Sequence, residues 1–133
     1  MGSVHRRLSR GLTKIKDGAS ARTVYEAALA DVRRLAPSLN TPQGKRAAEV
    51  LLGPKGTEPW ELHGVGLDDA EGLPEVLRTG MVVAYELMFT SDGDGFYLED
   101  MIAVTRDGYE VLTSGLPYTA REIEEVMKAR SQR

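Results

Sequence analysis

Apolar residues recur every three or four positions in three stretches of the first part of the chain, which is the spacing of one helix face. The first stretch covers residues 3–16, and Asp17-Gly18 ends it. The second begins after Ser20, a favoured N-cap residue, and the third begins at Thr41-Pro42, because proline suits the first helical position. The sequence therefore predicts three helices in this part.

From Trp60 onward the pattern changes to strands and turns. Residues 81–89 and 96–105 are predicted strands, and a cluster of turn-forming residues separates them. A short third strand is expected at residues 109–113, after a tight turn at Asp107-Gly108. This order predicts a hairpin-rich sheet.

A last helix is expected after Thr119, because Thr119 and Glu122 have the spacing of a capping box. Its apolar residues Ile123, Val126 and Met127 are expected to face inward. Helices followed by a sheet and another helix indicate the α+β class. With 133 residues the chain is long enough for one core, and the whole of it is expected to form a single domain.

Composition narrows the classes of function. The formal net charge is −3, so binding to nucleic acid is not expected. The absence of cysteine excludes disulfides, zinc–thiolate sites and cysteine nucleophiles. No apolar run approaches the roughly 20 residues of a membrane span, and the start of the chain lacks the pattern of a signal peptide. A cytoplasmic protein without membrane attachment is therefore expected.

Glu86 is the first candidate for chemistry, since it lies inside the apolar run of residues 81–89. Burial of an ionised carboxylate is costly unless the group is paired or binds a metal. If Asp92 and Gly93 are the two loop residues of the hairpin, Glu86 lies directly opposite Glu99. Two like charges at that distance destabilise a sheet, so a cation, a shared proton or a basic side chain must offset them.

The register of this hairpin has an alternative. Asp94-Gly95 is an equally good turn pair, and it would place Glu86 opposite Ala103. Glu86 could also face solvent at a sheet edge. The pairing of the two carboxylates therefore depends on which residues form the turn.

His63 lies in a Leu-His-Gly-Val-Gly-Leu segment, where glycine permits close approach of the backbone. A lone histidine is more often structural than a ligand, but one histidine with two glutamates is an ordinary ligand set for zinc, manganese or cobalt. Other sites fit less well. The glycines do not make a dinucleotide fingerprint, the acidic turn is too short for a calcium loop, and no nucleophile elbow is present.

Three segments together resemble the creatinase/aminopeptidase P/methionine aminopeptidase family. Residues 63–68 (HGVGLD) resemble its histidine motif, and residues 79–86 (TGMVVAYE) resemble its PGMV…E strand. Residues 95–112 (GFYLEDMIAVTRDGYEVL) resemble its IED…VT.DG.E.L strand and turn. The resemblance covers residues 3–118 and implies the C-terminal half of a pita-bread fold, with helices packed on a curved antiparallel sheet.

The resemblance also implies a hydrolase that binds two divalent ions, manganese, cobalt or zinc, and cleaves peptides as an Xaa-Pro aminopeptidase or dipeptidase. Carried over, His63, Glu86 and Glu99 are the matching metal ligands. Glu99 would bridge the ions, and Glu86 would also act in catalysis by moving a proton. The two aspartate ligands of the family have no match here. The chain alone is therefore expected to be inactive, with a peptide substrate and bound metal only in the complete site.

Departures from the family pattern favour a second interpretation, a non-catalytic binding or structural module. Pro59, Ala70 and Tyr97 stand where the family has helper groups, and Leu87 replaces a proline. These groups normally orient substrate or stabilise developing charge. Half of a pseudo-symmetric fold also exposes the face that the other half covers, so a homodimer is expected.

Overall fold

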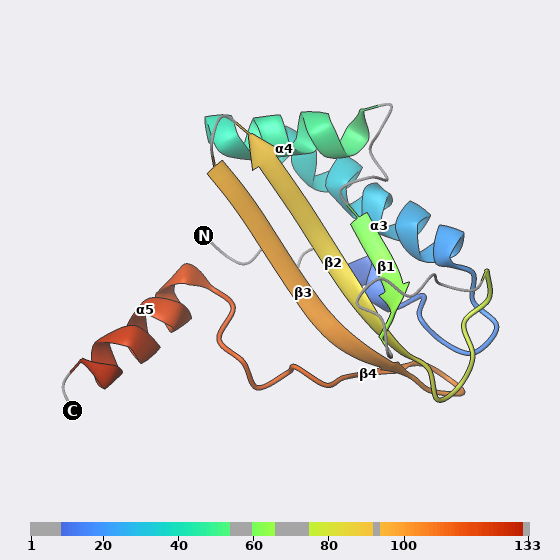
Figure 1. Cartoon of the computed structure of the whole chain (residues 1–133). Helices are drawn as coiled ribbons and strands as arrows, with labels where there is room; N and C mark the ends of the chain where they lie inside the picture. The colour runs from blue at the N-terminus through green and yellow to red at the C-terminus, as the bar shows by residue number, and fades with distance from the viewer. Residues whose placement is uncertain (1–8, 54–59, 66–74, 92–93, 132–133) are drawn as a thin grey trace.

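The structure, a computed structural model of the chain, describes residues 9–53, 60–65, 75–91 and 94–131 (Figure 1). Helices come first, strands follow, and a helix ends the order, as predicted. The elements are α2 (Ser9–Leu12), α3 (Ala21–Leu35), η1 (Ala36–Ser38), α4 (Pro42–Leu52), β1 (Trp60–Gly64), β2 (Val82–Ser91), β3 (Asp94–Val104), β4 (Tyr109–Val111) and α5 (Ala120–Arg130).

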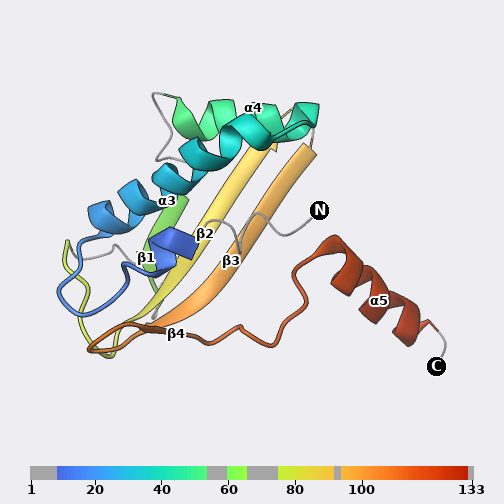
Figure 2. The ribbon, with the colours of Figure 1, turned by 180° about the vertical axis from the view of Figure 1, so that it is seen from behind.

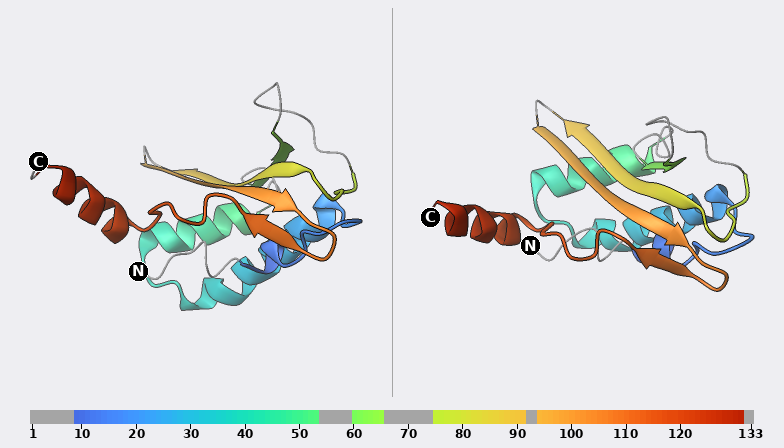
Figure 3. Two further views of the ribbon diagram at one scale, coloured as in Figure 1. Left: turned by 90° about the horizontal axis from the view of Figure 1, so that it is seen from below. Right: turned by 60° about the horizontal axis from the view of Figure 1, so that its bottom comes forward.

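The four strands form one antiparallel sheet in the order β1-β2-β3-β4. Helices α3 and α4 lie over one face of this sheet, as views from the front, from behind and from below show (Figures 1, 2 and 3). Within the described ranges, no helix covers the opposite face (Figure 3). The α+β class is therefore confirmed, and the arrangement leaves one sheet face open.

The core lies between the sheet and the helices. Successive side chains of a strand point to opposite faces, so every second residue of β2 points toward the helices. Val83 and Tyr85 of β2 pack with Ile102 of β3 against Val24 and Ala28 of α3, and all five are buried. The other residues of β2 consequently point to the open face.

Gly11 allows α2 to approach the sheet closely. A Cβ atom at this position would clash with the hydroxyl of Tyr85 and contact the Cβ of Ala28. The backbone of α2 therefore lies directly against a side chain of β2, which requires glycine.

Three predicted helix starts are confirmed. The side-chain oxygens of Ser20, Thr41 and Thr119 each accept a hydrogen bond from the backbone N–H three residues further on. Glu122 completes the predicted capping box at Thr119. These bonds satisfy N–H groups that have no partner within the helix.

The first helix ends earlier than predicted. Residues 1–8 lie outside the described part, and α2 ends at Leu12 rather than at residue 16. The chain turns because the N–H groups of Asp17 and Gly18 donate to the carbonyl groups of Thr105 and Leu77, and Gly18 has a φ of 78°, which favours glycine. At the predicted helix end, Asp17-Gly18, the backbone therefore contacts the segments just before β2 and just after β3.

Helix α5 extends away from the sheet and from the other helices (Figures 1 and 2). None of its residues is buried, and Ile123, Val126 and Met127 are 46%, 44% and 60% exposed. The prediction that these three face inward is wrong. The segment between β4 and α5 carries the helix beyond the sheet, where no other described element covers it (Figure 3).

Candidate metal centre

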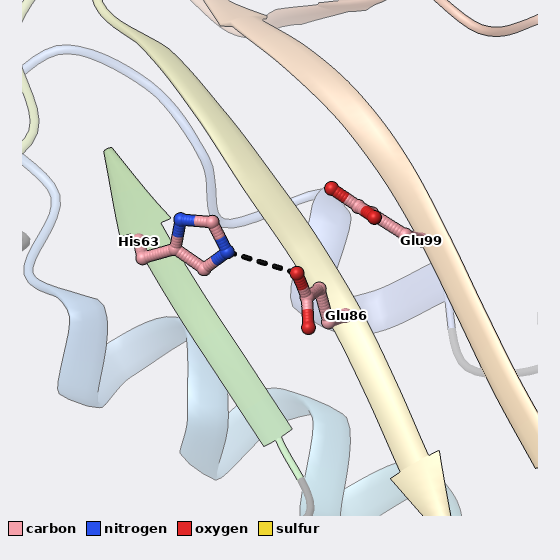
Figure 4. A group of neighbouring side chains, drawn as sticks. All are labelled: His63, Glu86 and Glu99. Atoms are coloured by element: carbon pink, nitrogen blue, oxygen red, sulfur yellow. Dashed lines mark hydrogen bonds and ion pairs between the residues drawn. The ribbon is translucent and has the colours of Figure 1, made fainter. Parts of the chain in front are cut away.

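Three neighbouring strands bring His63, Glu86 and Glu99 together. His63 lies on β1, Glu86 on β2 and Glu99 on β3, and all three side chains project from the open sheet face (Figure 4). Each residue offers one ligand atom, and these atoms lie within 4.8 Å of one another. A histidine nitrogen and two carboxylates from three separate segments therefore converge on one point.

The hairpin of β2 and β3 fixes the position of the two glutamates. Ser91 pairs with Asp94, and in the same register Glu86 pairs with Glu99. Ala103 pairs with Val82, so the alternative register that set it against Glu86 is wrong. The loop residues 92–93 lie outside the described residues, but the pairing on either side of them selects the register that places the carboxylates opposite each other.

Burial differs across the site. Glu86 is only 4% exposed, because β2 lies between β1 and β3. The alternative in which Glu86 faces solvent at a sheet edge is therefore wrong. His63 is partly buried, and Glu99 is exposed. The site is closed around Glu86 and open at Glu99, so an ion could enter from the Glu99 side.

Both ring nitrogens of His63 have partners. Nδ1 lies 2.9 Å from the carbonyl oxygen of Gly64, and Nε2 lies 2.8 Å from Oε1 of Glu86. Because a carbonyl oxygen can only accept, Nδ1 must be the protonated nitrogen. In the neutral ring Nε2 then has a lone pair, which is the form that binds a metal. The Gly64 carbonyl therefore orients His63 as a ligand through Nε2.

Without a cation, the contact between Nε2 and Glu86 needs a proton. The pKa of His63 is raised above its ordinary value, first by the hydrogen bond to the Gly64 carbonyl and then by the bond to the Glu86 carboxylate, while burial opposes the rise. A divalent ion would compete with this proton for the same lone pairs. Metal binding here is consequently expected to release a proton.

The donor set fits one divalent ion. One imidazole and two carboxylates suit zinc, manganese or cobalt. Two carboxylates opposite each other in a sheet also need a nearby positive charge. In the described part of the chain, no lysine or arginine forms an ion pair with Glu86 or Glu99. Three ligands are too few to hold two ions tightly, so these residues fit a single-ion site.

Tyr97, which the sequence marks only as a departure from the family pattern, also contributes to the site. Its hydroxyl donates to Oε2 of Glu99 over 3.3 Å. The pKa of Tyr97 is raised by desolvation and then by the carboxylates of Glu86 and Glu99, so the hydroxyl keeps its proton. The sequence could have indicated this contact through spacing alone. Tyr97 and Glu99 are two apart on one strand, and such residues share a face.

The other departures do not add to this cluster. Pro59 and Ala70 lie outside the described residues. Leu87 is buried in the hydrophobic core on the side of the helices, so it does not face His63 and Glu86. Its effect is on packing rather than on the site.

Comparisons with known proteins agree with the motifs. No family model matches the sequence. Xaa-Pro aminopeptidase 2 of Streptomyces coelicolor and that of Streptomyces lividans are each 31% identical to it over 143 residues, covering 92% of this chain and 30% of the relative. The chain thus spans about 30% of the length of the curated relatives it matches.

Solved structures show the same likeness. A Bacillus anthracis protein assigned as an aminopeptidase P matches with a TM-score of 0.68 at 26% identity, over 95% of this chain and 30% of that one. Aminopeptidase P from E. coli has a TM-score of 0.69 at 23% identity, over 98% of this chain and 34% of its own. The chain is similar in sequence and in fold to part of aminopeptidase P.

The likeness to aminopeptidase P confirms the expected fold. Helices on an antiparallel sheet form half of a pita-bread fold, and the match extends over nearly the whole chain. Among the residues that the structure describes, no helix is both long enough and apolar enough to cross a membrane.

Proposed function

We propose that the chain supplies His63, Glu86 and Glu99 to the metal site of an Xaa-Pro aminopeptidase- or dipeptidase-type hydrolase. The observation that supports this most directly is the convergence of their ligand atoms within 4.8 Å of one another. The Streptomyces relatives have the name Xaa-Pro aminopeptidase, so the proposed substrate is an Xaa-Pro peptide. The proposed metal is manganese, cobalt or zinc, the ions that this ligand set suits.

The three residues have different proposed roles. His63 binds through Nε2, because the Gly64 carbonyl keeps the proton on Nδ1. Glu86 would be a ligand that also moves a proton; its Oε1 lies 2.8 Å from Nε2 of His63, within hydrogen-bonding distance. Glu99 would be the bridging ligand of the complete site, and the Tyr97 hydroxyl donates a hydrogen bond to its Oε2. When bound, the metal supplies a Lewis acid and an activated water.

By itself, the 133-residue chain is proposed to be inactive. It offers one histidine and two glutamates to a family site that also uses two aspartates. The test is to incubate the purified chain with an Xaa-Pro peptide and added manganese. We expect no release of the first residue above a blank without protein, and the same result for Glu86→Gln. Sustained hydrolysis that Glu86→Gln abolishes would overturn the proposed inactivity.

A second candidate function is that of a non-catalytic binding or structural module. The observation in its favour is Tyr97, a neutral side chain that already occupies the open side of the site and bonds to Glu99. Failure of the chain to bind manganese would favour this function. Binding that depends on Glu86 would favour the peptidase-type site.

We also propose that the chain self-associates as a homodimer. The support is the sheet face that no described helix covers (Figure 3). Exposed surfaces of that kind tend to be interaction sites. Sedimentation of the purified chain measures this property separately from metal binding.

A further inference from the structure

Exposed apolar side chains concentrate in the C-terminal arm, which we define as residues 112–131. Eight large apolar residues are exposed among the described residues, and five of them belong to this arm. Single exposed apolar residues are ordinary, but a concentration of them marks an interaction surface. The five are Leu112, Leu116, Ile123, Val126 and Met127.

Helix α5 presents three of these residues as a stripe. Ile123, Val126 and Met127 are spaced three and four apart, so they lie on one side of the helix. Three views show α5 standing clear of the sheet and of α3 and α4 (Figures 1, 2 and 3). The stripe is therefore available to another molecule.

The charges of α5 are divided between its two halves. Residues 120–125 contain Arg121 and three glutamates, which gives a net charge of 1 − 3 = −2. Residues 126–130 contain Lys128 and Arg130 and no acidic residue, which gives +2. Two copies of α5 side by side in parallel would bring like halves together. An antiparallel pair brings the acidic half of each copy against the basic half of the other.

The ion pairs within α5 do not prevent such antiparallel pairing of two helices. Arg121 lies 2.9 Å from Glu125, and Lys128 lies 3.8 Å from Glu124, but all four side chains are more than half exposed. Such exposed pairs are weak, so their charges remain able to interact with a second helix. The antiparallel arrangement also sets Ile123 against Met127 of the second copy.

We propose that α5 pairs in antiparallel orientation with α5 of a second copy of this chain. This inference rests on the proposed self-association but places the contact at α5 rather than at the open sheet face; it does not depend on the metal. The arrangement is two-fold symmetric, because each copy gives the same stripe and the same two charged halves. The 11-residue helix allows a contact about 16 Å long.

The test uses two charge-reversed variants of the full 133-residue chain. Glu124→Lys/Glu125→Lys makes both halves of α5 basic, and Lys128→Glu/Arg130→Glu makes both halves acidic. Sedimentation equilibrium should show wild-type dimers and, for each variant alone, an association constant at least about tenfold lower. An equimolar mixture of the two variants should associate again, because only the mixed pair has opposite charges. Circular dichroism checks that α5 stays helical.

Three results would overturn the inference. A wild-type chain that is monomeric at high concentration would also overturn the proposed self-association, and would leave α5 to a different partner. Wild-type dimers that persist in both variants and in Ile123→Ser would place the contact elsewhere while keeping the self-association. Variants that fail to associate when mixed would exclude antiparallel pairing through these charges.

Discussion

Asp31 is a buried carboxylate of α3 that ties this helix to α2. It is 1% exposed and accepts a hydrogen bond from the backbone N–H of Arg10 over 2.9 Å. The guanidinium groups of Arg10 and Arg34 also lie within 3.2 Å and 3.0 Å of Oδ1. A single acidic side chain therefore satisfies groups from two helices.

We predict that Asp31→Ala lowers the free energy of unfolding by about 1.5–3 kcal/mol, the contribution expected of hydrogen bonds to a charged group. The matched control is Glu26→Ala on the same helix, whose pair with Arg22 is exposed on both sides. That change should stay within about 0.5 kcal/mol. Urea denaturation measures both, and equal effects would contradict the role given to Asp31.

The residues of the candidate site differ in how far the sequence could predict them. Glu86 and Glu99 follow from strand register, because a two-residue loop at 92–93 sets them opposite each other, although a second turn was equally good. That both glutamates lie close to His63 could be expected only from the family motifs, since His63 lies on a third strand. There it pairs with Ala84 of β2. The tautomer of His63 depends on the Gly64 carbonyl, which no residue pattern reveals.

Among the elements, the turn before β2 depends on Gly80. Its φ is 91°, and a Cβ added there would contact nothing within 4 Å. The cost of a side chain is therefore conformational rather than steric. We predict that Gly80→Ala destabilises the fold by about 1–2 kcal/mol, the cost of the left-handed region for an L-residue.

Gly115 provides the matched control for this prediction. A Cβ at Gly115 also meets open space, and its φ is not in the left-handed region. Gly115→Ala should change the midpoint of thermal unfolding little, with less than about 0.5 kcal/mol of effect. Equal shifts for the two alanine variants would show that the turn at Gly80 tolerates a side chain.

Helix starts were predictable and the surroundings of α5 were not. Capping is local, so Ser20, Thr41 and Thr119 could be found from short patterns. The direction of an apolar stripe shows only which side of a helix is apolar, not what covers it. Among the described residues no element covers α5, so the prediction that its apolar residues face inward failed.

At the scale of the whole molecule, the two faces of the sheet have different roles. The sheet face toward α3 and α4 holds the core, and the open face holds His63, Glu86 and Glu99 (Figure 4). Glu86 is the one charged residue of β2, and it lies on the open face. The fold class followed from the order of elements, whereas the likeness to the aminopeptidase P proteins could be recognised only from the three motifs together.

The central claim, that His63, Glu86 and Glu99 together hold one divalent ion, is tested most directly by calorimetric titration of Mn²⁺ into the purified chain. We predict about one ion bound per chain, with affinity lowered at least about tenfold in Glu86→Gln and in His63→Ala. Glu110→Gln, an exposed change on β4 of the same sheet, should bind as the wild type does. No Mn²⁺ binding, or binding that Glu86→Gln leaves unchanged, would contradict the claim.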